Sequence, residues 1–358
     1  MIASVCYAFM GVCMKANNSP RIEILQIVRL FAASMIILFH SGQIGNRGFF
    51  GVHIFFIISG FLAYCTTRTP VSPGRYLLKR WIRLLPLYWI FTGITFLVLT
   101  VRPDISRTAD GSLTLFLYSM AFIPGDSLPT LQVGWTLFYE VAFSVIFALS
   151  ILISHRYRVL IASIILLSLT AIGQFANPTG NFFTFYTEPW YFDFFLGMIT
   201  GVIYIRLRGS VSGEAPVLSV LSRPLRRIAC LVLSAAALLS AFFLVSGYTF
   251  SFETDNVFIL GMLSFVLILS LLLLMDRFRF PGILITLSGM TYSVYLVEYF
   301  TTSVYKRLFP ESMALIPLIL SLAALFAVTF LVSWIPWKLI EVKLTGFLRQ
   351  KLLPQREG

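Results

Sequence analysis

Long apolar stretches recur along the whole chain and constrain its fold more than any other feature. Ten of them approach twenty residues: 22–41, 49–66, 81–101, 135–154, 158–176, 188–205, 228–247, 256–275, 283–304 and 313–335. A helix of about twenty apolar residues crosses the hydrocarbon core of a bilayer. With 58% hydrophobic and only 12% charged residues, the composition also lies far outside that of soluble proteins. The sequence therefore predicts an all-α polytopic membrane protein, a bundle of about ten transmembrane helices.

Lysine and arginine residues sort to one side of the membrane when the loops are numbered alternately. Of the 27 basic residues, 21 fall on the side that carries both termini, and Arg29 lies within the first span. The opposite loops hold the remaining five: Arg47, Arg102, Arg107, Lys306 and Arg307. Because cytosolic loops are enriched in Lys and Arg, both termini are expected in the cytosol. The net charge of +12 thus reflects membrane topology, and no nucleic-acid partner is expected.

Spans and short loops occupy nearly the whole chain, so no separate soluble domain is expected. Residues 1–20 form a short N-terminal extension, residues 21–350 the transmembrane domain, and residues 351–358 a cytosolic tail. The apolar stretch 113–123 is too short to span and suits an interfacial or re-entrant segment. The cysteines lie in the extension or on the cytosolic side, so no disulfide is expected among them: Cys6, Cys13, Cys65 and Cys230.

Arg29 and His40 lie inside the first apolar stretch with ten residues between them. Eleven helical steps of 100° return to nearly the same direction, so both side chains should project from one face, roughly 16 Å apart along the axis. An arginine in hydrocarbon is costly and is rarely present without a partner or a function. The pair therefore indicates a catalytic or conducting path through the membrane.

Further ionisable residues sort by their expected depth. Five imidazole or carboxylate groups are expected in the outer third of the membrane: His40, His53, Glu140, Asp193 and Glu298. The inner side carries arginines instead: Arg29, Arg80 and Arg83. Imidazole and carboxylate suit proton transfer with a hydroxyl, and arginine suits phosphate binding. A phosphate-bearing donor from the cytosol and a hydroxyl-bearing acceptor outside would explain both groups, although each residue alone also fits an ordinary interfacial or topology-setting side chain.

Seven short motifs follow one another along residues 21–350. They are EILQIVRLFAASMIILFH (23–40), GVHIFFIISGFL (51–62), RYLLKRWIRLLPLYW (75–89), VGWTLFYEVAF (133–143), FFLGM (194–198), SGMTYSVYLVE (288–298) and IEVKLTGFLR (340–349). In this order they resemble the motifs of the acyltransferase 3 family of bacterial integral-membrane O-acyltransferases, and its exopolysaccharide acetyltransferase branch in particular. The first includes the family's arginine and histidine spacing, and Gln26 stands where many members have aspartate.

Two positions depart from the family pattern. His53 replaces an aspartate that is usual in the second motif, and Glu298 replaces a histidine that is usual at the end of the sixth. If the two side chains share a pocket, an imidazole–carboxylate pair is retained with its partners exchanged. Alternatively, this member has lost activity or uses a different acceptor.

The resemblance implies transfer of an acyl group, most often acetyl, from cytosolic acyl-CoA to a hydroxyl of an extracytoplasmic or lipid-linked glycan, in the bacterial inner membrane. Acyl-CoA would be a co-substrate, with no cofactor bound permanently. Its phosphates would lie near Arg80 and Arg83 and its pantetheine arm near Arg29. His40 would be the general base or a transient acyl carrier, and Glu140 would orient it or bind sugar hydroxyls.

The expected acceptor side comprises five further residues: His53, Glu298, Asp193, Trp135 and Tyr139. The two aromatic residues are expected at the outer rim, either in an interfacial belt or stacked on a sugar ring. The resemblance also implies a partnership with polysaccharide assembly machinery. Two outer histidines are too few for a metal site, so none is expected. The alternative function from another class is a proton-coupled transporter of a small polar solute, in which the same buried charges carry protons.

Overall fold

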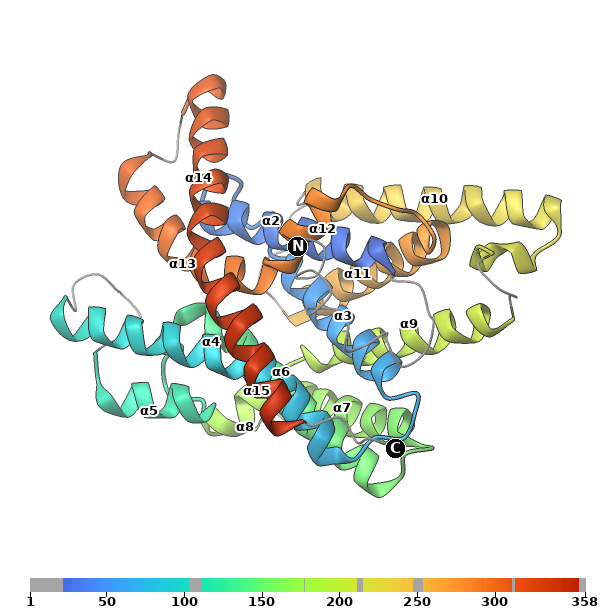
Figure 1. The fold of residues 1–358 in the computed structure, drawn as a ribbon, viewed down its shortest axis with the longest axis horizontal. Helices are drawn as coiled ribbons and strands as arrows, with labels where there is room; N and C mark the ends of the chain where they lie inside the picture. The colour runs from blue at the N-terminus through green and yellow to red at the C-terminus, as the bar shows by residue number, and fades with distance from the viewer. Residues whose placement is uncertain are drawn as a thin grey trace. The chain divides into compact units, whose positions relative to one another are not determined.

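The computed structural model describes residues 22–102, 111–176, 178–210, 215–246, 254–310 and 313–353. Within these ranges the chain is helical and contains no strand (Figure 1). The elements are α2 (Glu23–Ser41), α3 (Gly51–Thr66), α4 (Pro73–Val101), α5 (Leu113–Ala121), η2 (Gln132–Gly134), α6 (Trp135–Ile153), α7 (Arg158–Phe175), α8 (Asn181–Tyr186), α9 (Tyr191–Gly209), η3 (Val217–Val220), α10 (Arg223–Ser246), α11 (Thr254–Met275), α12 (Gly282–Gly289), α13 (Thr291–Leu308), α14 (Leu315–Pro336), η4 (Trp337–Leu344) and α15 (Thr345–Leu352). The extension 1–20 lies outside the described residues.

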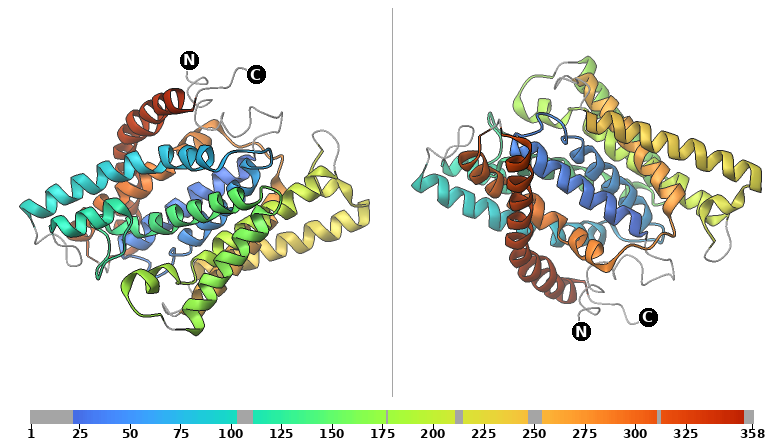
Figure 2. Two further views of the ribbon diagram at one scale, coloured as in Figure 1. Left: turned by 90° about the horizontal axis from the view of Figure 1, so that it is seen from below. Right: turned by 90° about the horizontal axis from the view of Figure 1, so that it is seen from above.

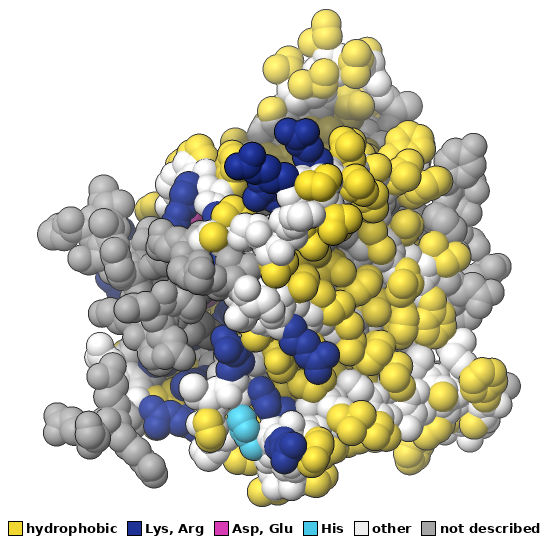
Figure 3. Space-filling view, turned by 90° about the vertical axis from the view of Figure 1, so that its right-hand side faces the viewer, with side chains coloured by type: hydrophobic (Ala, Val, Ile, Leu, Met, Phe, Trp, Pro, Cys, Tyr) yellow, Lys and Arg dark blue, Asp and Glu magenta, His cyan; other side chains and the backbone are white. Residues whose placement is uncertain are grey.

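Nine of the ten predicted spans each fall on one helix, and the ninth falls on two, α12 and α13. Among the described residues, eight helical segments are long and apolar enough to cross a membrane. Helix α3, which falls on the predicted span 49–66, is apolar but has only 16 residues. Helix α5 has nine residues and is too short to span, as expected. Much of the exposed surface consists of hydrophobic side chains, as a lipid-facing surface requires (Figure 3). The structure therefore confirms an all-helical, multi-span architecture.

The ninth predicted span is bent and consists of two helices. Helices α12 and α13 meet at Met290 with a bend of 65°. The hydroxyl of Thr291 donates to the carbonyl oxygen of Ser288 over 2.9 Å, and the Glu341 carboxylate accepts from the backbone N–H of Ser293 over 2.9 Å. These contacts satisfy groups at the break, so the chain can end one helix and begin another within an apolar run.

The third span also begins earlier than its apolar run suggests. Ser72 caps α4 by accepting a hydrogen bond from the backbone N–H of Arg75, and Pro73 occupies the first turn. Both residues are strong helix-start signals. Helix α4 consequently has 29 residues, and Arg80 and Arg83 lie two to three turns inside it. An apolar-run criterion misses this part because it is rich in basic residues.

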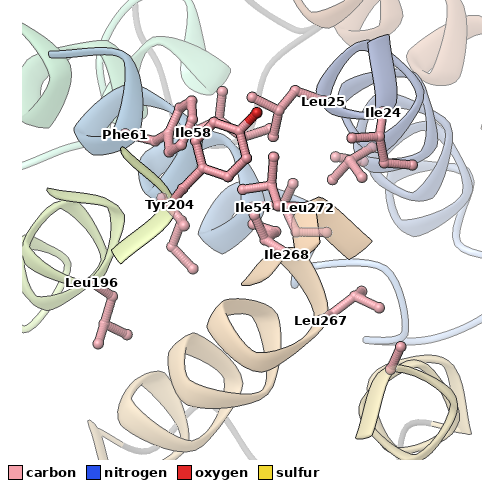
Figure 4. Packing of buried hydrophobic residues seen from close by; sticks show 14 of the residues in the cluster. Ile24, Leu25, Ile54, Ile58, Phe61, Leu196, Tyr204, Leu267, Ile268 and Leu272 are labelled. Carbon is pink, nitrogen blue, oxygen red and sulfur yellow. The ribbon is translucent and has the colours of Figure 1, made fainter. Parts of the chain in front are cut away.

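The chain divides into two compact units, which are described separately. The first comprises the described parts of residues 1–68, 192–291 and 301–330. In it α2 packs against α3, α11 and α12, while α11 packs against α3 and runs beside α10 (Figure 2). Apolar side chains of α2, α3 and α11 meet in its core, including Leu25, Ile54 and Ile268 (Figure 4).

Helices α3 and α9 approach within backbone contact in the first unit. A Cβ atom added to Gly60 would collide with the carbonyl oxygen of Phe194, and one added to Gly197 would collide with that of Ile57. Small residues permit this close packing of membrane helices. The approach matters for the site because it brings the start of α9 against α3.

The second unit comprises the described parts of residues 69–191, 292–300 and 331–358. Helix α4 contacts α5, α6, η4 and α15 there. Pro86 lies inside α4, and its ring removes the N–H that would bond the carbonyl of Ile82. The hydroxyl of Thr345 donates to that carbonyl over 3.4 Å, and the Tyr292 hydroxyl donates to the Leu84 carbonyl over 2.7 Å. The chain's last helical turns thus pack on the proline segment of α4.

Candidate functional site

Arg29 and His40 lie on one helix, as predicted. Helix α2 runs unbroken from Glu23 to Ser41, so the eleven-residue offset places the two side chains on the same face. Both side chains are half-buried. The helix ends at Gly42, whose left-handed φ of 79° suits glycine, and whose N–H bonds the carbonyl of Phe39 over 3.2 Å. His40 therefore sits in the last turn, beside the α2–α3 connection.

His53 of α3 and Asp193 of α9 form a fully buried pair in the first unit. The His53 Nδ1 atom lies 2.7 Å from Asp193 Oδ2, and both side chains are 0% exposed. An ionised carboxylate only accepts hydrogen bonds, so with Asp193 ionised the Nδ1–H group of His53 is the donor. Our sequence reading assigned both residues to the acceptor side but did not pair them. The exchange of His53 with Glu298 stays a prediction.

Gly261 of α11 completes the surroundings of this pair. A Cβ atom there would collide with Asp193 Oδ1 and would lie 3.8 Å from His53 Nδ1. Gly261 is the one glycine in α11, and a small residue there permits close approach of the Asp193 side chain from α9. The sequence carried this signal, but nothing in it identified the carboxylate that would fill the space.

We expect Gly261→Ala to destabilise the protein, because the added methyl group must displace the Asp193 carboxylate from its partner. The expected loss is about 1–3 kcal/mol, the usual range for overpacking. Thermal unfolding in detergent, followed by near-ultraviolet circular dichroism, measures it. Gly93→Ala is the matched control, because a Cβ atom on this helical glycine meets no atom within 4 Å. Equal unfolding temperatures for the two variants would contradict the close packing.

A row of rings connects His40 with the buried pair. The rings of His40 and Phe39 are 4.9 Å apart between centroids, those of Phe39 and Phe49 are 5.4 Å apart, and those of Phe49 and His53 are 6.2 Å apart. All belong to the end of α2, the connection after it and the start of α3. Two imidazoles in the first unit are thus held in one aromatic cluster.

Arg80 of α4 and Glu140 of α6 form an ion pair in the second unit. Their side chains are 15% and 12% exposed, so the pair is largely desolvated. The Arg80 guanidinium also lies 5.8 Å from the ring centroid of Tyr76 and 5.5 Å from that of Phe143. Aromatic faces and an opposite charge are the surroundings that a guanidinium needs when it is removed from water.

This ion pair corrects the depths assigned from sequence. Glu140 was expected in the outer third of the membrane and Arg80 at its cytosolic edge, yet the two side chains are in direct contact. The two expectations therefore cannot both hold. Helix α4 begins at Pro73, so Arg80 lies two turns inside this helix and not at its end. That Glu140 orients His40 or binds sugar hydroxyls stays a prediction.

Tyr139 is not a rim residue, and that expectation is wrong. Its side chain is fully buried, its ring stacks on Phe185 with centroids 4.5 Å apart, and its hydroxyl donates to the Phe185 carbonyl over 2.8 Å. The indole N–H of Trp190 donates to Glu188 over 2.8 Å. Trp135 is half-buried, with its ring centroid 5.1 Å from that of Trp190. These rings form an internal aromatic cluster, which leaves Tyr139 no open face for a sugar.

Two buried acidic residues lie near the start of α13 in the second unit. Glu298 is fully buried two turns into the helix, which is consistent with its predicted position within the membrane. Glu341 is only 2% exposed and accepts hydrogen bonds from both the backbone N–H and the hydroxyl of Ser293. It lies in η4, a π-helical segment, and no local pattern revealed its burial.

The other predicted elements of the site are simpler. Arg83 is half-buried one turn after Arg80. Within the described ranges no group of three or more His, Cys, Asp or Glu residues could hold a metal ion. Cys65 and Cys230, the two cysteines among the described residues, are half-buried.

The fold defines a multi-pass helical membrane protein, and Arg29 and His40 of α2 show that it carries ionisable groups inside its helices. The acyltransferase 3 family, described as an acyltransferase domain, matches residues 22–338, and the chain belongs to this family. It is thus a membrane acyltransferase. A similar protein is the exopolysaccharide production protein ExoZ of Rhizobium meliloti (strain 1021), 28% identical over 284 residues that cover 75% of this chain and 83% of the relative. No solved structure matches the chain.

Proposed function

We propose that the protein is an O-acetyltransferase of the bacterial inner membrane. It moves an acetyl group from cytosolic acetyl-CoA to a hydroxyl of an extracytoplasmic or lipid-linked glycan. The observation that carries the proposal is the pairing of Arg29 and His40 on one face of α2, in a chain of the acyltransferase 3 family. The similarity to ExoZ, an exopolysaccharide production protein, supports a polysaccharide acceptor and a place beside polysaccharide assembly machinery.

The topology that fits this function has ten spans and cytosolic termini. Eight of these spans are the long apolar helices of the described residues. The bent pair α12–α13 counts as the ninth span, and the short apolar helix α3 counts as the tenth. The distribution of 21 basic residues against five supports the orientation. In this topology the end of α2 faces outward and the start of α4 faces the cytosol.

In the proposed reaction, the His40 imidazole takes the proton of the acceptor hydroxyl. The hydroxyl oxygen attacks the thioester carbonyl carbon, the carbon–sulfur bond breaks, and the imidazolium returns its proton to the departing CoA thiolate. Arg29 stands roughly 16 Å from His40 along the helix, too far to contact the same carbonyl group. Its charge therefore serves the donor path, where a guanidinium can bind phosphate or amide oxygens.

Arg83 is the cation we expect to bind the donor phosphates most directly. Glu140 already neutralises Arg80, whereas Arg83 projects one turn farther along α4 and is half-buried. In the proposed topology α4 begins on the cytosolic side, and Arg83 lies about three turns inside it, so the donor phosphates would reach it from that side. Charge-assisted hydrogen bonds to phosphate are worth about 1.5–3 kcal/mol each.

The test uses inside-out membrane vesicles supplied with labelled acetyl-CoA, with transfer of label to glycan as the readout. Vesicles without the protein should transfer none. Arg83→Ala is expected to raise the KM for acetyl-CoA about tenfold or more, because phosphate contacts are mainly ground-state binding. Arg75→Ala, in the first turn of the same helix, removes an equivalent charge as control. Label transfer independent of the protein would refute the proposed function, and equal KM values for both variants would refute the role of Arg83.

A further inference from the structure

A cavity of about 400 Å³ lies in the first unit, beside the connection between α2 and α3. Its lining comes from the connection itself, from α10 and from α11: Gln43, Ile44, Gly45, Asn46, Arg47, Phe50, Phe243, Leu244 and Leu260. Small-molecule sites typically occupy about 300–1,000 Å³, with apolar walls and a few polar groups. This cavity has that composition, because three polar side chains and five large apolar ones line it.

The connection that forms the rim has a defined backbone. Gly42, Gly45 and Gly48 all have left-handed φ angles, and a Cβ atom on Gly48 would collide with the carbonyl oxygen of Met35. The Gln43 amide nitrogen donates to the carbonyl of Pro310 over 3.1 Å, which ties the connection to the segment after α13. The polar rim is therefore held in place by tertiary contacts.

The charge at this rim is positive. Arg47 is the one charged residue that lines the cavity, and no Asp or Glu is among the described lining residues. A second cation lies at the start of the same connection, because a Cβ atom on Gly42 would stand 3.7 Å from the Lys306 side chain. Gly42 follows His40 by two residues. Arg47 therefore belongs to the connection that leaves the proposed catalytic helix, and Lys306, in the last turn of α13, lies beside the start of that connection.

We infer that this cavity binds the acceptor and selects a glycan that carries a negative charge. The Gln43 and Asn46 amides can bond sugar hydroxyls, Phe50 offers an apolar wall, and Arg47 binds a carboxylate or phosphate oxygen. The inference rests on the proposed function, which places this connection on the outer side. The charge can be a uronate on the glycan or the diphosphate of a lipid-linked saccharide, because both present the same anionic oxygens.

The experiment measures acetyl transfer in membrane vesicles to three acceptors of equal length: a neutral oligosaccharide, its uronate analogue, and the neutral saccharide on a polyprenyl diphosphate. We expect kcat/KM for at least one anionic acceptor to exceed that for the neutral one about tenfold. Arg47→Ala should remove most of that preference, and Lys306→Ala part of it. Arg102→Ala, an outer cation outside the cavity, is the control and should leave the preference intact. The acceptor that loses its preference identifies the source of the charge.

Several results would overturn the inference. One is transfer that is equally fast to all three acceptors; another is an equal loss for all three in Arg47→Ala. In a third result, the loss of acetyl transfer in Arg47→Ala depends on the anionic-lipid content of the vesicles and not on the acceptor. That result would assign Arg47 to the lipid surface and would also overturn the inference. Each of these outcomes includes transfer to glycan by the unaltered protein, so the proposed function would survive. Absence of transfer to every acceptor would instead refute both.

Discussion

Replacing His40 by alanine is expected to abolish acyl transfer while the protein still inserts in the membrane. General acid–base catalysis by a positioned side chain contributes about 10²–10⁴-fold to a rate, and no other imidazole stands in the last turn of α2. The helix itself should persist, because alanine is a good helix former. Mass spectrometry of the cell-surface glycan and vesicle transfer rates measure the loss.

His155→Ala provides the matched control for this variant. His155 is the third histidine of the chain and lies between α6 and α7, where its backbone carbonyl, retained in the variant, accepts a bond from Arg158 over 2.7 Å. Partial recovery of the His40→Ala rate with added imidazole would separate a chemical role from a structural one. A wild-type level of acetylated glycan in His40→Ala would exclude His40 as the base.

Glu140→Ala should cause the largest loss of stability among single changes in the candidate site. Removing one partner of a buried ion pair leaves the other charge desolvated, at a cost on the order of 3 kcal/mol. Arg80 is 15% exposed and is surrounded by aromatic rings, so water can compensate only in part. Thermal unfolding in detergent measures the loss, and acyl transfer should fall with it.

Glu23→Ala is the comparison for this prediction. This variant also loses an ion pair and a hydrogen bond from the backbone N–H of Phe280, but the arginine left behind is 64% exposed, so water can solvate it. The double variant Arg80→Met with Glu140→Leu should recover much of the stability without the activity, since no charge then remains buried. If Glu140→Ala is no more destabilising than Glu23→Ala, the pair does not hold α4 to α6. Full activity in the double variant would show that the pair has no role in transfer.

The sequence by itself determined which segments are helical and which residues share a helix face. Both properties depend on local chemistry. Apolar runs near twenty residues specify membrane helices, and Arg29 and His40 share a face because the helical repeat is a property of a single segment. The family could also be recognised, because its motifs are short and each lies within one helix or its ends.

Only the tertiary structure decided which ionisable residues meet. Asp193 is 140 positions from His53, Glu140 is 60 positions from Arg80, and Glu341 is 48 positions from Ser293. Each pairing depends on the relative position and rotation of two packed helices. Small residues such as Gly60 and Gly261 permit close packing, but the sequence does not show which residue approaches them. For the same reason the bend at Met290 was not predicted: an apolar run has the same composition whether it is straight or broken, and the groups that stabilise the break come from elsewhere in the chain.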